Sequence, residues 1–367
     1  MFKRIICILL CCTIFGNIGG FVFAENTIEA RNEALAVSTV KEWFLNNYQK
    51  FYIVEDAKFE LIRYHKKEQS THYTVSAFCK TQLKFDSVYD LPYVKGMYEE
   101  IEKMGLSEKE SNEMLQIIDE YTKNSIDFSH DSIPLSIDIV VEIGDERTNK
   151  DSITLYYKDG MNTTLYPISV VELDEEELYK DGQDVFKELY KSNKNATNNT
   201  KGYYYYNRID ARDYALSYTG QNVTSCYDDG TSCGIMQDRT QWNNSEYYYI
   251  DNLKHNDCAD FVSQCLEEGG IPVDPGKWER FYDGNNGWSW TSVYGQENYM
   301  TSKGYWDSST FASANAGNII RWTNQSHVGL ITLNDTVTHR FTAHTDDRYN
   351  YQFYNSTIYY YYTINTN

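Results

Sequence analysis

The chain has 367 residues, with 53 acidic and 33 basic side chains and a formal net charge of −20. This length suits two domains of ordinary size better than one. Hydrophobic residues make up 41% of the chain, which is enough for a packed core and excludes wholesale disorder. The acidic balance argues against nucleic acid and anionic membrane surfaces as partners, because both require a basic protein face.

The first residues have the pattern of a targeting segment. Lys3 and Arg4 precede an apolar stretch, which ends at Ala24 in a sequence that suits a signal peptidase. We expect residues 1–24 to be a signal peptide, so that the mature protein is secreted and is extracellular or associated with the cell wall. A retained anchor is the alternative, although glycines interrupt the apolar stretch. No other stretch is apolar enough to span a membrane, so we expect no stable insertion after the signal is removed.

Residues 25–191 alternate between helical and strand patterns. Apolar residues at helical spacing predict helices over residues 28–48, 93–124 and 174–191. Apolar and β-branched patterns predict strands over residues 57–64, 70–85, 133–143, 151–158 and 164–172. These elements predict an α+β module with an antiparallel sheet, cystatin-like or NTF2-like, without a catalytic constellation. The Asn-rich stretch 192–202 is typical of a linker and separates this module from a second domain at residues 203–367.

Removal of the signal segment leaves five of the eight cysteines, which are Cys79, Cys226, Cys233, Cys258 and Cys265. Export permits a disulfide, and Cys226 and Cys233 flank a turn-rich loop that such a bond would close. The sequence does not decide between a Cys226–Cys233 disulfide and two free thiols. The odd count requires at least one free thiol with another role.

The segment that follows Asp257 has the pattern of a short helix. Asp257 is a favourable N-cap, and the apolar residues from Cys258 to Leu266 fall on one helical face. We therefore expect Cys258 in the first turn, where unpaired N–H groups and the helix dipole favour a thiolate and can bind an oxyanion. The alternative is that Cys258 only fills the core, as we expect for Cys265.

A thiol nucleophile needs a base, and a predicted hairpin supplies histidines. Residues 326–333 have a strand pattern, and a turn at Asn334-Asp335 leads into a strand that contains His339 and His344. If the hairpin closes on that turn, His327 and His344 share a face. If the loop is one residue longer, His344 stays near His327 while His339 lies roughly 13 Å away along the strand. We therefore expect His327 as the base and His344 as the group that orients it.

Six motifs occur in an order that resembles the putative amidase domain family, a bacterial branch of the papain-like cysteine peptidase superfamily that lies beside the NlpC-type and CHAP cell-wall hydrolases. The resemblance covers about residues 203–360, and its motifs are YNRIDARDYALSY (206–218), DCADFVSQCLEEGGI (257–271), WSWTSVY (288–294), AGNIIRW (316–322), SHVGL (326–330) and AHTDD (343–347). The sequence departs from the family at Asn318, where Asp is usual, and at Ala259, where Thr or Ser is commoner. NlpC-type enzymes place the orienting histidine about twelve residues after the base, which would select His339 instead of His344.

The resemblance implies a papain-like C-terminal domain in which the helix that begins at Cys258 packs on an antiparallel sheet. It implies amide hydrolysis through a Cys258 thioester, with His327 as base and His344 as its orienting group. The candidates for substrate contact are Asp257, Trp288 and Trp290, with a role in the fold as the alternative for the tryptophans. Peptidoglycan or a peptide is the expected substrate of such an exported enzyme, and we expect no cofactor or metal. Arg208 either lines the site or forms a structural ion pair.

Two other functions compete with this interpretation. A zinc site would use His255, Cys258 and Cys265, but the spacing matches no common zinc module. The two cysteines are also two helical turns apart, about 10.5 Å, which is too far for one ion. The second is a non-catalytic, secreted cell-wall-binding protein with a vestigial Cys–His site, in which the N-terminal module is the binder.

Overall fold

The computed structural model describes most of the chain. The described residues are 20–144, 152–159, 164–195, 205–220, 241–243, 257–279, 287–345 and 347–365, with the backbone alone for residues 20–27 and 192–195. Several expectations fall outside this part, namely most of the signal segment, the end of the Asn-rich stretch, Cys226, Cys233 and His255.

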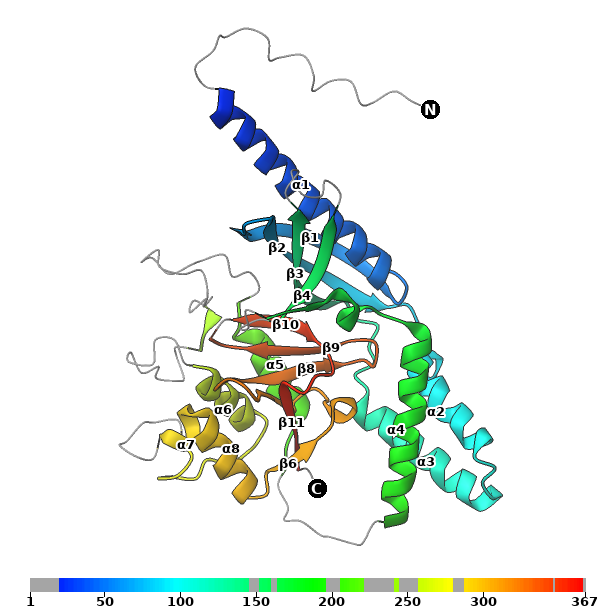
Figure 1. Ribbon diagram of the computed structural model, residues 1–367. Helices are drawn as coiled ribbons and strands as arrows, with labels where there is room; N and C mark the ends of the chain where they lie inside the picture. Colours follow the sequence, from blue (N-terminus) through cyan, green and yellow to red (C-terminus); the bar gives the residue numbers. More distant parts are fainter. Residues whose placement is uncertain are drawn as a thin grey trace.

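In the N-terminal half, a long helix packs on an antiparallel sheet (Figure 1). Helix α1 (Gly20–Tyr48) buries Ala36, Val40, Phe44 and Tyr48, which recur every fourth residue on one face. The sheet consists of β1 (Tyr52–Lys66), β2 (Ser70–Leu83), β3 (Ile133–Gly144), β4 (Ile153–Lys158) and β5 (Leu165–Pro167). The predicted α+β arrangement with an antiparallel sheet is confirmed for this half. Its likeness to cystatin or NTF2 stays a prediction.

Two sequence-based boundaries in this half are wrong. The helix predicted over residues 93–124 is two helices, α2 (Pro92–Lys103) and α3 (Glu108–Ser125), because Gly105 adopts a φ of +59° and Ser107 begins α3 with a capping box. The strand predicted over residues 164–172 consists of β5 followed by the 3₁₀ helix η2 (Ile168–Val171). A further 3₁₀ turn, η1 (Val88–Asp90), precedes α2.

Helix α4 (Glu175–Asn195) packs against α2 with a close approach of the two backbones. A Cβ atom added at Gly182 would lie 1.8 Å from the carbonyl oxygen of Tyr93, and one added at Gly96 would lie 2.0 Å from that of Tyr179. Both positions therefore require glycine, although glycine lowers helix stability elsewhere. This contact fixes α4 against α2.

The C-terminal half contains a second group of antiparallel strands with helices packed on one face (Figure 1). Its helices are α5 (Arg208–Ser217), α6 (Cys258–Glu268), α7 (Trp288–Thr291), α8 (Val293–Ser302) and the 3₁₀ turn η5 (Phe311–Ser313). Its strands are β6 (Trp306–Ser309), β7 (Ile319–Trp322), β8 (Val328–Asn334), β9 (His339–Ala343), β10 (Arg348–Phe353) and β11 (Tyr359–Ile364). Helices α5 and α6 pack on β8 and β9. Within the described residues, no helix is long and apolar enough to cross a membrane.

The two halves share one mixed sheet, in the order β1-β2-β3-β10-β9-β8-β7-β11-β6. The junction is a parallel pairing of β3 and β10 at Ser136 and Tyr351. One apolar cluster also contains residues of both halves, from Tyr48 on α1 to Phe353 on β10. The fold class is therefore α+β, as predicted, but the halves are continuous in sheet and core.

Buried polar groups tie the halves together at this junction. The guanidinium of Arg340 on β9 donates to the Pro134 carbonyl at 2.7 Å and to the Thr81 hydroxyl at 2.9 Å. The hydroxyl of Tyr52 donates to the Asp335 carboxylate at 2.7 Å. Without the N-terminal half, Arg340 would lose its Pro134 and Thr81 acceptors and keep only Thr338 and Asp335, and a lost partner of a buried charge costs more than the bond contributes when formed. The domain boundary at residues 192–202 stays a prediction, but the structure argues against two independently stable domains.

We predict that residues 203–367 expressed alone do not unfold cooperatively, whereas residues 25–367 do. The fragment exposes the paired edge of β10 and removes the Pro134 and Thr81 acceptors of the buried Arg340. Thermal unfolding followed by near-ultraviolet circular dichroism measures the difference, because this signal requires fixed aromatic packing. A sharp transition in the fragment, within a few degrees of the longer chain, would contradict the shared core.

Candidate active site

Cys258 is the first residue of α6, which confirms its predicted position in the first turn. The residue is 4% exposed. Its thiol lies 3.9 Å from the Ser326 carbonyl oxygen and accepts a hydrogen bond from the main-chain N–H of Val328. The sulfur therefore lies against the chain that enters β8.

The environment of the thiol keeps it protonated in this state. Burial raises the pKa of Cys258 to about 12, and the Asp257 carboxylate acts in the same direction. The main-chain N–H groups of Val328, Ala259 and Cys258 itself lower the pKa, but burial outweighs them. The expected lowering of the thiol pKa at the helix start is therefore not found in this buried state.

The remainder of α6 packs as the sequence predicts. Phe261, Val262, Cys265 and Leu266 are fully buried against the sheet. Cys265 is thus a core residue, and burial raises its pKa well above the ordinary value. Within the described residues, no group of histidines, cysteines and carboxylates is placed to hold a metal ion.

Asp257 anchors the start of α6 to the end of β9. Its carboxylate lies 2.6 Å from Nδ1 of His344, and its main-chain N–H donates to the Thr345 hydroxyl at 2.7 Å. Its side chain makes no capping hydrogen bond to the helix. The predicted capping hydrogen bond is therefore absent, because a carboxylate oxygen of Asp257 faces an imidazole instead. Its substrate contact stays a prediction.

His344 is fully enclosed by protein groups. Its Nε2 lies 2.8 Å from the carbonyl oxygen of Tyr218, the residue that ends α5. The ring stacks on Phe261 at 3.8 Å and on Trp242 at 4.6 Å between centroids. Burial lowers the pKa of His344, while the nearby Asp347 carboxylate and the Tyr218 carbonyl oppose that change.

The hydrogen-bond geometry fixes how many hydrogens this group holds. Both ring nitrogens of His344 face oxygen atoms, so one hydrogen lies toward Tyr218 and a second lies between His344 and Asp257. A pair with two such hydrogens has no net charge. The pair is a neutral clamp that joins α5, α6 and β9.

The orienting role of His344 stays a prediction, and in this structure both of its ring nitrogens face groups other than His327. The hairpin register accounts for this separation. Leu330 pairs with Thr342 and Ile331 with Phe341, so the turn is longer than predicted. Asp335 holds that longer turn by accepting hydrogen bonds from the N–H groups of Val337 and Thr338.

This register places His327 and His344 on opposite faces of the sheet. Two residues beyond the Leu330 pair, Val328 lies opposite His344, and both belong to the face covered by α6. Side chains alternate along a strand, so His327 points to the other face. Its ring contacts Trp322 there, with 4.5 Å between centroids.

His327 is a buried, neutral imidazole. Burial lowers its pKa to about 3, and the positive charge of Arg348 contributes. Among the described residues its Nδ1 has no hydrogen-bond partner, and no hydrogen bond joins its ring to the Cys258 thiol. Yet its main chain lies between Ser326 and Val328, the two residues whose backbone groups contact that thiol.

His339 is remote from His327. It pairs with Asn334 at the turn end of the hairpin, seven residues beyond His327 along β8. At ~3.3 Å per residue the separation is about 23 Å. The twelve-residue spacing of NlpC-type enzymes therefore does not bring these two histidines together.

The two candidate tryptophans have different environments. Trp290 is buried, and its indole N–H donates to the Asp260 carboxylate, so it has the core position that was its alternative, while its substrate contact stays a prediction. Trp288 is 52% exposed on α7, which packs on α6. Arg208 forms an ion pair with Asp127 at 2.6 Å, which confirms the structural alternative for that residue.

Sequence reasoning missed the cluster of buried polar and aromatic residues around the start of α6. Burial and the charge of Asp257 raise the pKa of Asp260 well above its ordinary value, and Trp290 and Gln264 hold its carboxylate. Tyr218 and Trp242 complete the enclosure of His344. Apart from the Gln264–Asp260 bond within α6, these contacts join residues at least 30 positions apart, and no local sequence pattern indicates them.

Comparison with known proteins bears on the C-terminal half. No curated protein and no solved structure matches the chain. Residues 205–366 match the family model described as "Putative amidase domain", and the matched segment contains Cys258, His327 and His344. This match suggests amide hydrolysis as the activity of the C-terminal half.

Proposed function

We propose that the protein is a cysteine-dependent amidase or peptidase with Cys258 as its nucleophile. One observation carries this proposal: the thiol lies at the start of a helix, where the main-chain N–H groups of Cys258, Ala259 and Val328 act to lower its pKa. Such donors stabilise a thiolate and can receive the negative charge of a tetrahedral intermediate. The amidase family match of the same segment provides independent support.

His327 is the proposed base. It is neutral, its Nδ1 has no partner among the described residues, and it is the residue between the two that contact the thiol. It also precedes the first residue of β8, where a change of main-chain torsion can move a side chain between sheet faces. In the active form the ring turns from Trp322 toward Cys258, since catalytic hydrogen bonds often tighten only with substrate.

The proposed reaction has two steps. His327 takes the thiol proton, the sulfur attacks the amide carbonyl, and the C–N bond breaks as His327 returns that proton to the leaving amine. Water then hydrolyses the thioester with His327 as base, which releases the carboxylic acid and restores the thiol. The His344–Asp257 clamp acts as a positioning group, because it fixes the residue that precedes Cys258.

The proposed substrate is peptidoglycan or a peptide, and the proposed location is outside the cell or at the cell wall. The signal pattern of residues 1–24 and the resemblance to cell-wall hydrolases support both. Trp288 is the remaining candidate for substrate contact, because it is exposed on the helix that packs on α6.

A non-catalytic, secreted wall-binding protein is the second candidate. The observation that favours it is the protonated thiol of Cys258, with a raised pKa and no hydrogen bond to an imidazole within the described residues. Iodoacetamide separates the two, because an enzyme is inactivated by one adduct on Cys258. A binding protein keeps its affinity for peptidoglycan whether or not that adduct forms.

We predict that Cys258→Ser abolishes release of products from purified peptidoglycan while the protein stays folded. The hydroxyl retains the shape of the thiol but is a much weaker nucleophile without an adjacent base. Mass spectrometry of the digest reports both activity and the bond that is cut. The matched control is Cys265→Ser, which is expected to keep activity and to lose about 1–2 kcal/mol of stability, because it places a hydroxyl in the core. An active Cys258→Ser protein would reject the nucleophile assignment.

We predict that His327→Gln lowers turnover by about 10²–10⁴-fold, the usual contribution of a general base. His339→Gln is the matched control and is expected to retain turnover within threefold, because of its distance from the thiol. His344→Gln is expected to lower the free energy of unfolding by about 1–3 kcal/mol, since it disturbs two buried hydrogen bonds. Urea unfolding and turnover on one substrate separate the three effects. Loss of turnover in His339→Gln but not in His327→Gln would show that the base is misassigned.

A further inference from the structure

A row of paired residues leads across the sheet from the candidate nucleophile. The main-chain N–H of Val328 contacts the Cys258 thiol. Val328 pairs with Arg321 on β7, and Arg321 pairs in turn with Tyr360 on β11. Directly paired residues of antiparallel strands point to the same face of a sheet. Val328 belongs to the apolar cluster that contains α6, so Arg321 and Tyr360 lie on the face that bears the thiol.

The guanidinium of Arg321 is held by two aromatic rings. Its central carbon lies 4.9 Å from the ring centre of Tyr294 on α8 and 5.5 Å from that of Tyr360. Both rings are 51% exposed, so they form part of the molecular surface. The exposed Trp288 adjoins them, because its ring lies against Gly295, the residue after Tyr294. Two cation–π contacts restrict the orientation of the guanidinium, which therefore loses little further freedom when it binds a ligand.

Most of the hydrogen-bond donors of Arg321 have no acceptor. Its Nε lies 3.2 Å from a carboxylate oxygen of Glu297 on α8 and is enclosed by protein. The other four N–H hydrogens are on Nη1 and Nη2, and among the described residues these two nitrogens form no hydrogen bond. Unlike Nε they are not enclosed, so the 6% of the side chain that is exposed includes them. A nearly buried cation with unmatched donors costs free energy, which an acceptor from outside the chain would recover.

The chemistry of this group favours a carboxylate as that acceptor. A guanidinium presents parallel N–H groups that match the two oxygen atoms of a carboxylate, so one ligand group satisfies two donors. The attraction between the charges is also stronger where protein replaces most of the water. Glu297 occupies only the Nε side of Arg321, which leaves the Nη side for the ligand.

The distance to the thiol places this ligand group within a substrate of the proposed reaction. Neighbouring strands lie about 4.8 Å apart, so a guanidinium above β7 and β11 is on the order of 10 Å from a thiol beside β8. An extended peptide covers that distance in about three residues. We propose that Arg321 binds a carboxylate of the substrate, within about three residues of the amide bond that Cys258 attacks. This site rests on the proposed function and narrows its substrate class to peptides that carry a free carboxylate near the cleaved bond.

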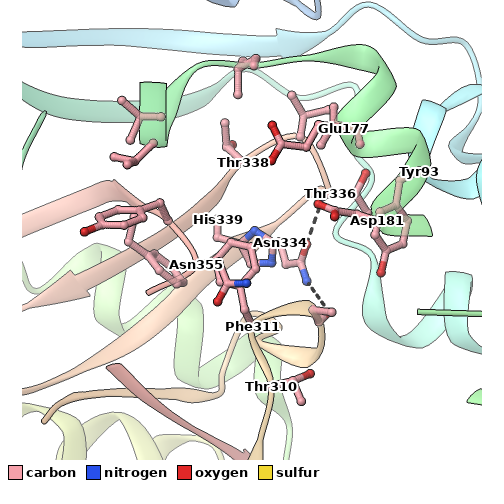
Figure 2. Close-up of a pocket in the computed structure, with 18 of the residues that line it drawn as sticks. Tyr93, Glu177, Asp181, Thr310, Phe311, Asn334, Thr336, Thr338, His339 and Asn355 are labelled. Carbon is pink, nitrogen blue, oxygen red and sulfur yellow. Dashed lines mark hydrogen bonds between the residues drawn. The ribbon is translucent and has the colours of Figure 1, made fainter. Parts of the chain in front are cut away.

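The cavity shown in Figure 2 lies elsewhere. Its volume is about 670 Å³, and its lining includes Tyr359 and Tyr361. These two residues alternate with Tyr360 along β11, so they point to the other face of the sheet. Among the described residues that line the cavity there is neither Cys258 nor Arg321. The cavity is therefore separate from the proposed carboxylate site.

The first test compares two peptides that differ in charge. The N-acetylated stem peptide L-Ala-γ-D-Glu-L-Lys-D-Ala carries two free carboxylates, and its diamide carries none. Isothermal titration calorimetry on Cys258→Ser in residues 25–367 measures both affinities without turnover. We expect the acid to bind with one site per chain and at least tenfold more tightly than the diamide. Equal affinities, or no saturable binding of the acid, would overturn the proposal.

The second test locates the site with matched charge changes in the same background. Arg321→Gln is expected to weaken binding of the acid at least tenfold and that of the diamide less than threefold. The control is Arg212→Gln on α5, which removes a positive charge that pairs with Asp213 at 2.7 Å and is expected to change the affinity for the acid less than threefold. Equal losses in the two variants would reduce the effect to net charge and overturn the site. Unchanged affinity for the acid in a folded Arg321→Gln protein would do the same.

A third variant acts in the opposite direction. Glu297→Gln keeps the shape of its side chain but removes the negative charge beside Arg321, so we expect the acid to bind at least threefold more tightly and the diamide to bind as before. The melting temperature checks the folding of each variant, and Glu297→Gln keeps the proposal testable if Arg321→Gln is unstable. Unchanged or weaker binding of the acid in a folded Glu297→Gln protein would overturn Arg321 as the charged group of the site.

The same experiments separate the carboxylate site from the proposed reaction. If the wild-type chain releases products while Cys258→Ser binds acid and diamide equally, the carboxylate site alone is rejected. If Cys258→Ser prefers the acid through Arg321 while the wild-type chain releases no product from peptidoglycan or from the acid, the hydrolytic function alone is rejected, and Arg321 belongs to a binding protein for acidic peptides.

Discussion

The start of helix α6 fills the gap that opens where β9 ends beside β8, and the candidate active site depends on that insertion. The pairing of β8 with β9 ends at Leu330 and Thr342, and the main-chain groups of residues 326 and 328 face the Cys258 thiol. On the other side of the gap, His344 and Thr345 hold Asp257. The nucleophile is thus positioned mainly by backbone groups, which cannot be changed by substitution of their side chains.

In this arrangement one histidine positions the start of the helix, and a different histidine is the proposed base. His344 holds the helix start through a neutral pair with Asp257, whereas His327 lies on the opposite sheet face with an unused nitrogen among the described residues. In the resting state the buried Cys258 thiol is protonated and the buried His327 imidazole is neutral. Activation of the proposed enzyme therefore requires movement at the start of β8, and the shared sheet links that strand to the N-terminal half through β9 and β10.

Local features of the fold were predictable from the sequence, and long-range ones were not. The helix that begins at Cys258 and the burial of Cys265 follow from apolar spacing within one segment. The hairpin register does not, because Asp335 stabilises a turn longer than the two residues that the sequence pattern favours. The His344–Asp257 contact spans 87 residues, and the union of the two halves depends on the β3–β10 pairing, the shared apolar cluster and buried hydrogen bonds between residues far apart in the chain. Such contacts depend on tertiary packing, which periodicity does not encode.

The most direct test of the central claim is to trap the acyl-enzyme. The mature chain is incubated with 4-nitrophenyl acetate, quenched in acid and digested, and the acylated peptide is located by mass spectrometry with and without hydroxylamine. The account predicts one hydroxylamine-sensitive acetyl group, on Cys258, that is lost as turnover proceeds. A hydroxylamine-sensitive group on another residue, or hydrolysis of the ester at full rate in Cys258→Ser, would contradict it.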